Sequence, residues 1–166
     1  MANAPSNNIW KDEWTSRGTE PWQNGICTRR VCRGEIVGAT LHEMPPHNSG
    51  GAYHFHHGNE EMLIVLSGTP TLRTPEGERV LEEGEVVVFA RGAQGAHKCS
   101  NPTDAPVRYL FISNNAHPDA VEYPDAGLLS VMARTEDQFG RPLWHMRRVA
   151  KDDKPPMVNA DGKPTG

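Results

Sequence analysis

Short apolar runs separated by turn-forming residues make up the middle of the chain, and this alternation limits the fold more than any other feature. The 14 prolines and 16 glycines divide the sequence, and hardly any stretch keeps apolar residues at helical spacing over three turns. The runs are rich in β-branched and aromatic residues, as strands are: GEIVGATLHEM (34–44), EMLIVLSG (61–68), TPTLRT (69–74), ERVLEEG (78–84), EVVVFA (85–90), AHKCSN (96–101) and VRYLFISN (107–114). Many short strands at close spacing predict an antiparallel sandwich or barrel.

The chain length of 166 residues fits one domain, within which the sequence changes character along its length. The first part carries Trp10, Trp14 and Trp22, which we expect to fasten an arm to the barrel or to a partner subunit. From Lys151 onward the chain is poor in apolar residues, so burial cannot offset the entropy of ordering. We therefore expect an N-terminal arm (1–33), a barrel core (34–115), a C-terminal extension packing on the barrel (116–150) and a flexible tail (151–166).

Charge and hydropathy exclude two classes of partner. Lys and Arg number 17 against 21 Asp and Glu, so the net charge of -4 gives no basic surplus for nucleic acid. No apolar run approaches the ~18 residues of a membrane span, and the opening MANAPSNNIWKDEW lacks the layout of a secretory signal. Cys27, Cys32 and Cys99 are odd in number, and we expect reduced thiols. These features predict a cytoplasmic protein that binds neither nucleic acid nor membrane.

Candidate metal ligands gather in GGAYHFHHGNEEMLIVLSG, residues 50–68. In an extended strand, His54 and His56 project from one side and His57 from the other. A turn after His57 lets Glu60 or Glu61 return toward the first pair, and the alternation of the next strand does not decide between the two carboxylates.

A fourth ligand follows the apolar strand EVVVFA, where a glycine-rich loop returns through His97. Only a β-barrel would fold this histidine back beside the first pair. Three neutral imidazoles and one carboxylate suit a divalent first-row transition metal, namely Fe, Mn, Ni, Co or Zn. Calcium and magnesium are disfavoured by nitrogen ligands.

The two histidine-containing stretches resemble the two motifs of the cupins. The first motif, HxH followed by Glu and Gly at fixed spacings, is similar to His54-Phe-His56, four residues, Glu61, six residues, Gly68. The second motif, Gly, five residues, PxG, two residues, His, three residues, Asn, is similar to the stretch from Gly84 to Asn101, with His97 in the histidine position. Ala90 replaces the usual proline, and four residues instead of two precede His97, as in single-domain bacterial cupins.

This resemblance implies an all-β fold, a small antiparallel double-stranded β-helix (a jelly-roll, or cupin barrel), with the metal inside. It also implies that His54, His56, Glu61 and His97 hold the metal, which selects Glu61 over Glu60. Small cupins often pair, so the resemblance implies a homodimer.

For the glycines and polar residues outside the proposed ligand set, we expect structural roles, turns or surface positions. We expect His57 and Glu60 to play a structural or supporting role, and Gly68, Gly84 and Gly92 to form turns. Four further histidines are expected at the surface: His42, His47, His117 and His145. Arg73, Arg108 and Tyr109 lie on strands, and Arg108 and Tyr109 point to opposite faces, so at most one of these two lines the cavity.

Three functions compete. The first is a metal-dependent enzyme acting on a small polar organic substrate, of dioxygenase, isomerase, lyase or decarboxylase type. The second is a non-catalytic protein that binds a small ligand, a sugar or an acid, through the metal. The third is a structural or storage-like role in which the metal stiffens the barrel. We favour the enzyme.

Overall fold

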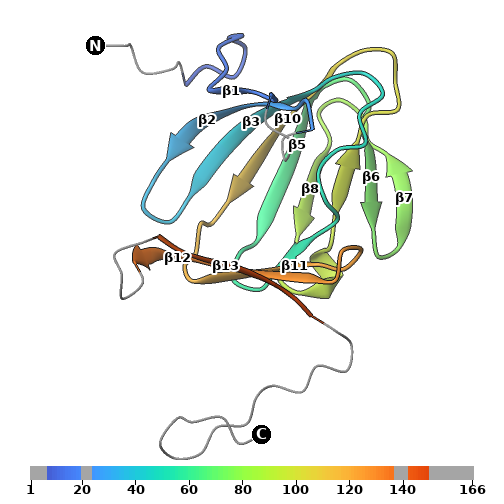
Figure 1. The fold of residues 1–166 in the computed structure, drawn as a ribbon. Helices are drawn as coiled ribbons and strands as arrows, with labels where there is room; N and C mark the ends of the chain where they lie inside the picture. Colours follow the sequence, from blue (N-terminus) through green and yellow to red (C-terminus); the bar gives the residue numbers. More distant parts are fainter. Residues whose placement is uncertain (1–6, 20–23, 137–141, 150–166) are drawn as a thin grey trace, which may run out of the picture.

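The computed structural model describes residues 7–19, 24–136 and 142–149. These residues form antiparallel strands and one 3-10 turn, with no α-helix among them (Figure 1). The part of the chain that is described holds no helix long and apolar enough to cross a membrane. The strands are β1 (Ser16–Arg17), β2 (Cys27–Arg33), β3 (Gly38–Met44), β4 (Phe55–His56), β5 (Glu61–Ser67), β6 (Thr71–Thr74), β7 (Gly77–Val80), β8 (Val86–Phe89), β9 (Lys98–Ser100), β10 (Val107–Ser113), β11 (Asp119–Tyr123), β12 (Leu128–Glu136) and β13 (Pro142–Arg148), and the 3-10 turn is η2 (Ala93–Gly95).

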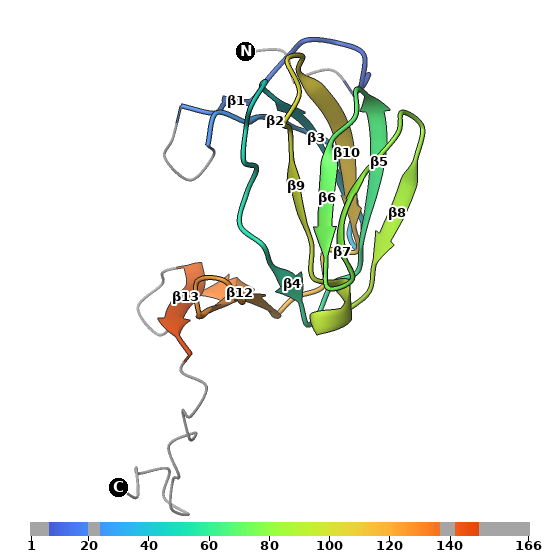
Figure 2. The same ribbon diagram turned by 90° about the vertical axis from the view of Figure 1, so that its right-hand side faces the viewer.

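The strands form three sheets. A six-stranded sheet has the order β1-β2-β3-β10-β5-β8, a three-stranded sheet the order β7-β6-β9, and a four-stranded sheet the order β13-β12-β11-β4. The three-stranded sheet faces the six-stranded one, and the four-stranded sheet lies across one end of both (Figure 2). Each of the seven runs that the sequence marked as strands overlaps one, and the predicted antiparallel jelly-roll barrel is confirmed.

The main core lies between the two facing sheets. Leu63 and Val65 of β5 are fully buried there and pack in one cluster with Leu72 of β6 and Tyr109 of β10. Because residues two apart share a face of a strand, Glu61 projects to the same side as Leu63 and Val65, into the barrel. The orientation of β5 therefore selects Glu61 over Glu60, the choice that strand alternation in the sequence left open.

The outer face of the six-stranded sheet is covered by the N-terminal segment. Val31, Ala39 and Leu41 form a second buried cluster, against which Ile9 and Trp14 pack. Trp14 thus fastens the segment to the sheet as expected, whereas Trp10 is 65% exposed. Trp22 and the predicted tail 151–166 lie outside the described residues.

Residues of the N-terminal segment also build the sheet, since β1 and β2 extend it beyond β3. Arg108 points outward from β10, donates to Glu43 at 2.6 Å and to Asp12 at 2.5 Å, and lies 5.4 Å from the Trp14 ring centroid. Tyr109, its neighbour, is buried inside the barrel.

The four-stranded sheet comes mostly from the segment after the barrel. In it, β11 pairs with the short strand β4, so Val121 lies opposite His56 and Glu122 opposite Phe55. Beside this sheet, Arg73 of β6 forms an ion pair with Asp125 and lies 4.0 Å over the Tyr53 ring. The histidine-bearing strand is therefore held from behind by residues far along the chain.

Candidate metal centre

His54 and His97 lie directly opposite each other in an isolated antiparallel bridge. Each backbone N–H donates to the other residue's carbonyl, at 3.2 Å from His54 and 2.9 Å from His97. Residues directly opposite in such a pair project to the same face, and the two imidazole centroids are 4.7 Å apart. The bridge is what brings the two histidine-containing segments together.

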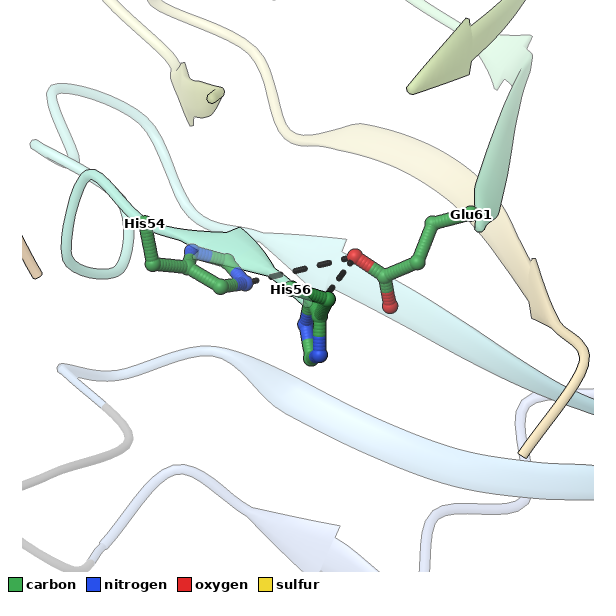
Figure 3. Close-up of side chains that lie close together, drawn as sticks. All are labelled: His54, His56 and Glu61. Atoms are coloured by element: carbon green, nitrogen blue, oxygen red, sulfur yellow. Dashed lines mark ion pairs between the residues drawn. The ribbon is translucent and has the colours of Figure 1, made fainter. Parts of the chain in front are cut away.

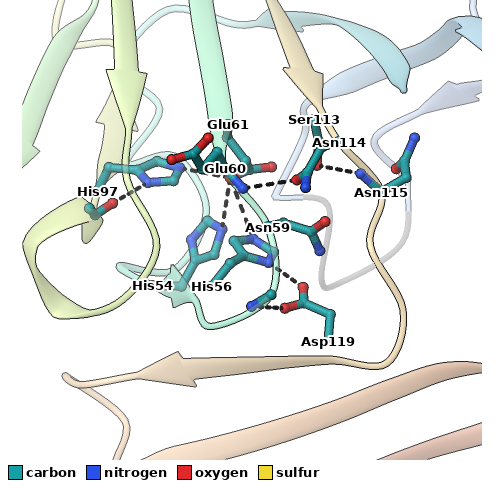
Figure 4. A network of polar contacts seen from close by, with 12 residues as sticks. His54, His56, Asn59, Glu60, Glu61, His97, Ser113, Asn114, Asn115 and Asp119 are labelled. Carbon is teal, nitrogen blue, oxygen red and sulfur yellow. Dashed lines mark hydrogen bonds and ion pairs between the residues drawn. The ribbon is translucent and has the colours of Figure 1, made fainter. Parts of the chain in front are cut away.

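Glu61 opens β5 and places its carboxylate among three imidazoles (Figure 4), of which Figure 3 shows those of His54 and His56. Its Oε2 lies 3.3 Å from Nε2 of His97, 3.4 Å from Nε2 of His56 and 4.0 Å from Nε2 of His54. The side chains are largely shielded from solvent, from 2% exposed for His97 to 27% for His54. The structure thus brings together all four residues predicted as ligands.

The hydrogen bonds of the imidazoles fix which nitrogen faces the centre. Nδ1 of His54 lies 2.9 Å from the carbonyl oxygen of Ala52, and Nδ1 of His97 lies 2.9 Å from that of Gly95. Because a carbonyl only accepts, each Nδ1 carries the proton and donates it. Each Nε2 is then left with a lone pair directed at Glu61, which is the form that binds a metal.

His56 is held by a carboxylate that the sequence analysis did not identify. Asp119 Oδ2 lies 2.5 Å from His56 Nδ1, and Asp119 Oδ1 accepts from the backbone N–H of Gly58 at 2.9 Å. No local signal marks Asp119, because it reaches His56 only through the pairing of β11 with β4. An imidazole held by a carboxylate in this way is common behind metal sites.

Two buried atoms at this centre lack a hydrogen-bond partner, Oε2 of Glu61 and Nε2 of His97. With Nδ1 of His97 protonated, both atoms present lone pairs to each other at 3.3 Å, which is unfavourable unless a cation or a proton lies between them. Nitrogen and oxygen donors of this kind fit a divalent transition metal. His54, His56 and Glu61 have ligand atoms within 4.8 Å of one another, and no other such group occurs in the described residues.

Burial and the neighbouring polar groups shift the pKa values of three residues at this centre. Burial lowers the pKa of His54 to about 4, so this imidazole is neutral at pH 7. Burial acts to raise the pKa of Glu61, but the three surrounding imidazoles outweigh it and the pKa is lowered. For His56, burial acts to lower the pKa, whereas the hydrogen bond to Asp119 and the charge of Glu61 raise it overall.

The departures from the second motif are accommodated by the backbone. The additional residues before His97 lie in the 3-10 turn η2, where Gly95 N–H donates to Gly92 O at 2.9 Å and Ala96 N–H to Ala93 O at 3.2 Å. Gly92 has a φ of 81°, which favours glycine, and its N–H donates to the His56 carbonyl at 2.8 Å. The longer loop therefore anchors the first motif.

The neighbouring polar residues mostly follow expectation. His57 points away from the centre and lies 2.8 Å from Glu122, while Glu60 is exposed. His47, His117 and His145 are also exposed, as predicted, although His117 lies at the cavity described next.

A cavity of about 530 Å³ opens onto the four residues. His42 lines it, which corrects the prediction that His42 lies at the surface. The reason is that Leu41 packs under the N-terminal segment, so the alternation of β3 turns His42 inward. Its ring stacks on Tyr109, with centroids 5.1 Å apart and planes at 7°, and burial lowers its pKa to about 4.

Comparisons with known proteins agree with this geometry. Residues 40–113 match the family described as the Cupin domain. A sugar phosphate isomerase from a cupin superfamily, from Silicibacter pomeroyi, has 23% identity over 83% of each chain and a TM-score of 0.65. A candidate sugar phosphate isomerase from Acidithiobacillus ferrooxidans has 23% identity over 78% of this chain and 83% of its own, with a TM-score of 0.62. No curated protein matches the chain in sequence.

Proposed function

Since the chain is a cupin-superfamily protein with a cupin domain at residues 40–113, we propose that it is a metal-dependent enzyme acting on a small polar organic molecule. One observation carries the proposal. Glu61 Oε2 and His97 Nε2 are buried without hydrogen-bond partners beside an open cavity of about 530 Å³, a volume typical of small-molecule sites. An arrangement that only stiffened the barrel would not need this opening.

His54, His56, Glu61 and His97 would hold one divalent ion, which is Fe, Mn, Ni, Co or Zn. When bound, such an ion supplies Lewis acidity toward an oxygen of the substrate. The backbone carbonyls of Ala52 and Gly95 keep His54 and His97 in the binding tautomer, and Asp119 does the same for His56. Phe89 stacks on His97 with centroids 3.8 Å apart and limits its rotation.

His42 supplies a base on the wall of the same cavity. Its ring contacts are with Tyr109 and Phe111, and within the described residues no hydrogen bond occupies its nitrogens. Because its pKa is about 4, the imidazole is neutral at pH 7, and one ring nitrogen has a lone pair that can accept a hydrogen bond or a proton from a bound substrate. A base beside a Lewis acid favours an isomerase or lyase over a dioxygenase. The fold-sharing Silicibacter pomeroyi protein is named an isomerase, a reaction that such a base would serve.

The first experiment is elemental analysis of protein purified without added metal. We expect about one divalent transition metal ion per chain, lost in His97→Ala and Glu61→Ala. His57→Ala is the matched control, because His57 faces away and should leave the metal content unchanged. Wild-type protein that takes up no metal after reconstitution, or His97→Ala protein that keeps full occupancy, would contradict the site.

The second experiment is an activity screen of the metal-loaded protein on hydroxy acids and sugar derivatives, with oxygen consumption recorded in parallel. Turnover without oxygen uptake, lost in His42→Gln while metal content is kept, is the expected result. Oxygen uptake would assign a dioxygenase instead. Tight binding of a sugar or an acid without turnover would support the non-catalytic binding protein.

We also propose that the protein is a homodimer. Val86 and Val88 are 54% and 61% exposed on β8, the edge strand of the six-stranded sheet, and exposed apolar edges favour self-association. Analytical ultracentrifugation should give a dimer, and Val88→Lys should shift it toward monomer; a wild-type monomer at all concentrations would refute this. A cytoplasmic location stays a prediction, with which the three free cysteines are compatible.

A further inference from the structure

Two exposed arginines of β2, Arg30 and Arg33, also line the cavity. The pairing of β2 with β3 shifts register between Arg30 and Cys32, so that Arg30 lies opposite Thr40 and Arg33 opposite Gly38. Thr40 and Gly38 also line the cavity. The irregularity in β2 thus keeps both arginines on the cavity side.

Four other arginines have partners in the structure, and Arg17 and Arg91, which have no ion pair within the described residues, do not line the cavity. Arg29 is buried and donates to the backbone carbonyls of Asn8 and Lys11, and Arg73, Arg79 and Arg108 each form an ion pair with a carboxylate. Within the described residues, Arg30 and Arg33 are exposed and have neither an ion pair nor a side-chain hydrogen bond. Their positive charge is therefore available to a ligand.

The carboxylates of the cavity do not offset this charge. Glu61 is the one surrounded by the three imidazoles, and Asp119 is hydrogen-bonded to His56 and Gly58. Both lie beside the histidines (Figure 4). Two strands, β10 and β3, separate Glu61 of β5 from Arg33 of β2, so a molecule that spans the cavity meets the histidine cluster at one end and uncompensated guanidinium groups at the other.

We propose that the ligand is an anion whose carboxylate or phosphate monoester group binds to Arg30 and Arg33. This inference rests on the proposed function for the part of the ligand that reaches the metal centre, but the anion site itself does not need the metal. A planar guanidinium donates two parallel hydrogen bonds to either kind of group, which the two share as a common chemistry. The cavity has the volume of a small-molecule site.

The test is titration calorimetry of the full chain at low ionic strength, with inorganic phosphate and malonate as probes. Wild type and the double variant Arg30→Gln/Arg33→Gln are compared, each metal-loaded and after chelation. Arg148→Gln is the matched control, since Arg148 is exposed on β13 and lines none of the cavity. Metal content and circular dichroism establish that the variants are folded and loaded.

We expect the double variant to bind at least one probe about 10-fold more weakly than wild type, with unchanged metal content, and Arg148→Gln to match wild type. Arg30→Lys/Arg33→Lys should recover part of the affinity, because the charge returns without the paired hydrogen bonds. The ratio of phosphate affinity to malonate affinity shows whether the site prefers a phosphate group or a carboxylate group.

The outcomes separate this inference from the proposed function. If wild type binds neither probe, or the double variant binds as tightly as wild type, the anion site is refuted even where metal binding is normal. If the protein holds no metal but the chelated form still shows arginine-dependent anion binding, the enzyme proposal fails and the anion site stands.

Discussion

Asp119 Oδ2 lies 2.5 Å from Nδ1 of His56, although 63 positions separate the two residues in the chain. The Asp119 side chain is 1% exposed. Burial acts to raise the pKa of this carboxyl, but hydrogen bonds with His56, Asn59 and Gly58 outweigh it and lower the pKa. An ionised, buried carboxylate therefore orients His56 and keeps its Nε2 available.

Replacing Asp119 should weaken the metal site without removing a ligand. Asp119→Asn keeps an acceptor for His56 but loses the charge, and we expect metal affinity to fall about 10-fold or more. Competition with a chromophoric chelator measures this. Glu122→Gln is the control, because Glu122 bonds the outward-facing His57 and should leave the affinity unchanged. Equal affinities in Asp119→Asn and wild type would show that Asp119 is only structural.

The contrast between Asp119 and the four predicted ligands shows how far the sequence reaches. His54 and His56 share one face of a strand, but alternation left Glu60 and Glu61 open, and the resemblance to the cupin motifs selected Glu61 and placed His97 with them. Asp119 needs the pairing of β11 with β4, a long-range contact that no local pattern encodes.

His42 was misplaced for a related reason. A strand with one solvated face would turn either His42 or Leu41 to water, but both faces of β3 are covered. The outer face packs under Ile9 and Trp14 of the N-terminal segment, and the inner face lines the cavity. The sequence indicated that segment without indicating which surface it covers, so the environment of His42 was not predictable.

Glu61→Gln should abolish metal binding and yet stabilise the metal-free protein. The amide of Gln at this position donates a hydrogen bond to Nε2 of His97, which has no partner beside a carboxylate. We expect the chelated variant to gain about 1 kcal/mol in unfolding free energy at a pH of about 8. Urea denaturation measures the difference.

Added metal supplies the control for this substitution, since it should raise the melting temperature of wild type and not of Glu61→Gln. A variant less stable than chelated wild type would mean that Glu61 already has a favourable partner without the metal.

His42 should make the stability of the chelated protein depend on pH. Its folded pKa of about 4 lies below the unfolded value of 6.5, so the unfolded state binds more protons between these two values. Stability is therefore lost as the pH falls from about 6.5 to about 4, by up to about 3 kcal/mol from this group.

His42→Phe keeps an aromatic ring against Tyr109 but cannot titrate. Urea unfolding of both chelated proteins at about pH 7.5 and about pH 4.5 should show a smaller loss of stability in the variant. His54, which also has a pKa of about 4, contributes equally in both proteins and cancels in the comparison. Identical losses would show that His42 is readily protonated in the folded state.

Trp14 and Trp10 test whether the N-terminal segment stabilises the barrel. Trp14 packs on the cluster of Val31, Ala39 and Leu41 and lies under the Arg108 guanidinium, whereas Trp10 is 65% exposed. We expect Trp14→Ala to lower the unfolding free energy by about 2 kcal/mol, since a half-buried aromatic ring and a cation–π contact are lost together. Trp10→Ala, which removes the same chemical group four residues away, should stay within about 0.5 kcal/mol of wild type.

Urea denaturation followed by circular dichroism avoids the change in fluorescence that either substitution causes. If the two variants lost the same stability, the segment would contribute through its backbone strands β1 and β2 rather than through the packing of Trp14.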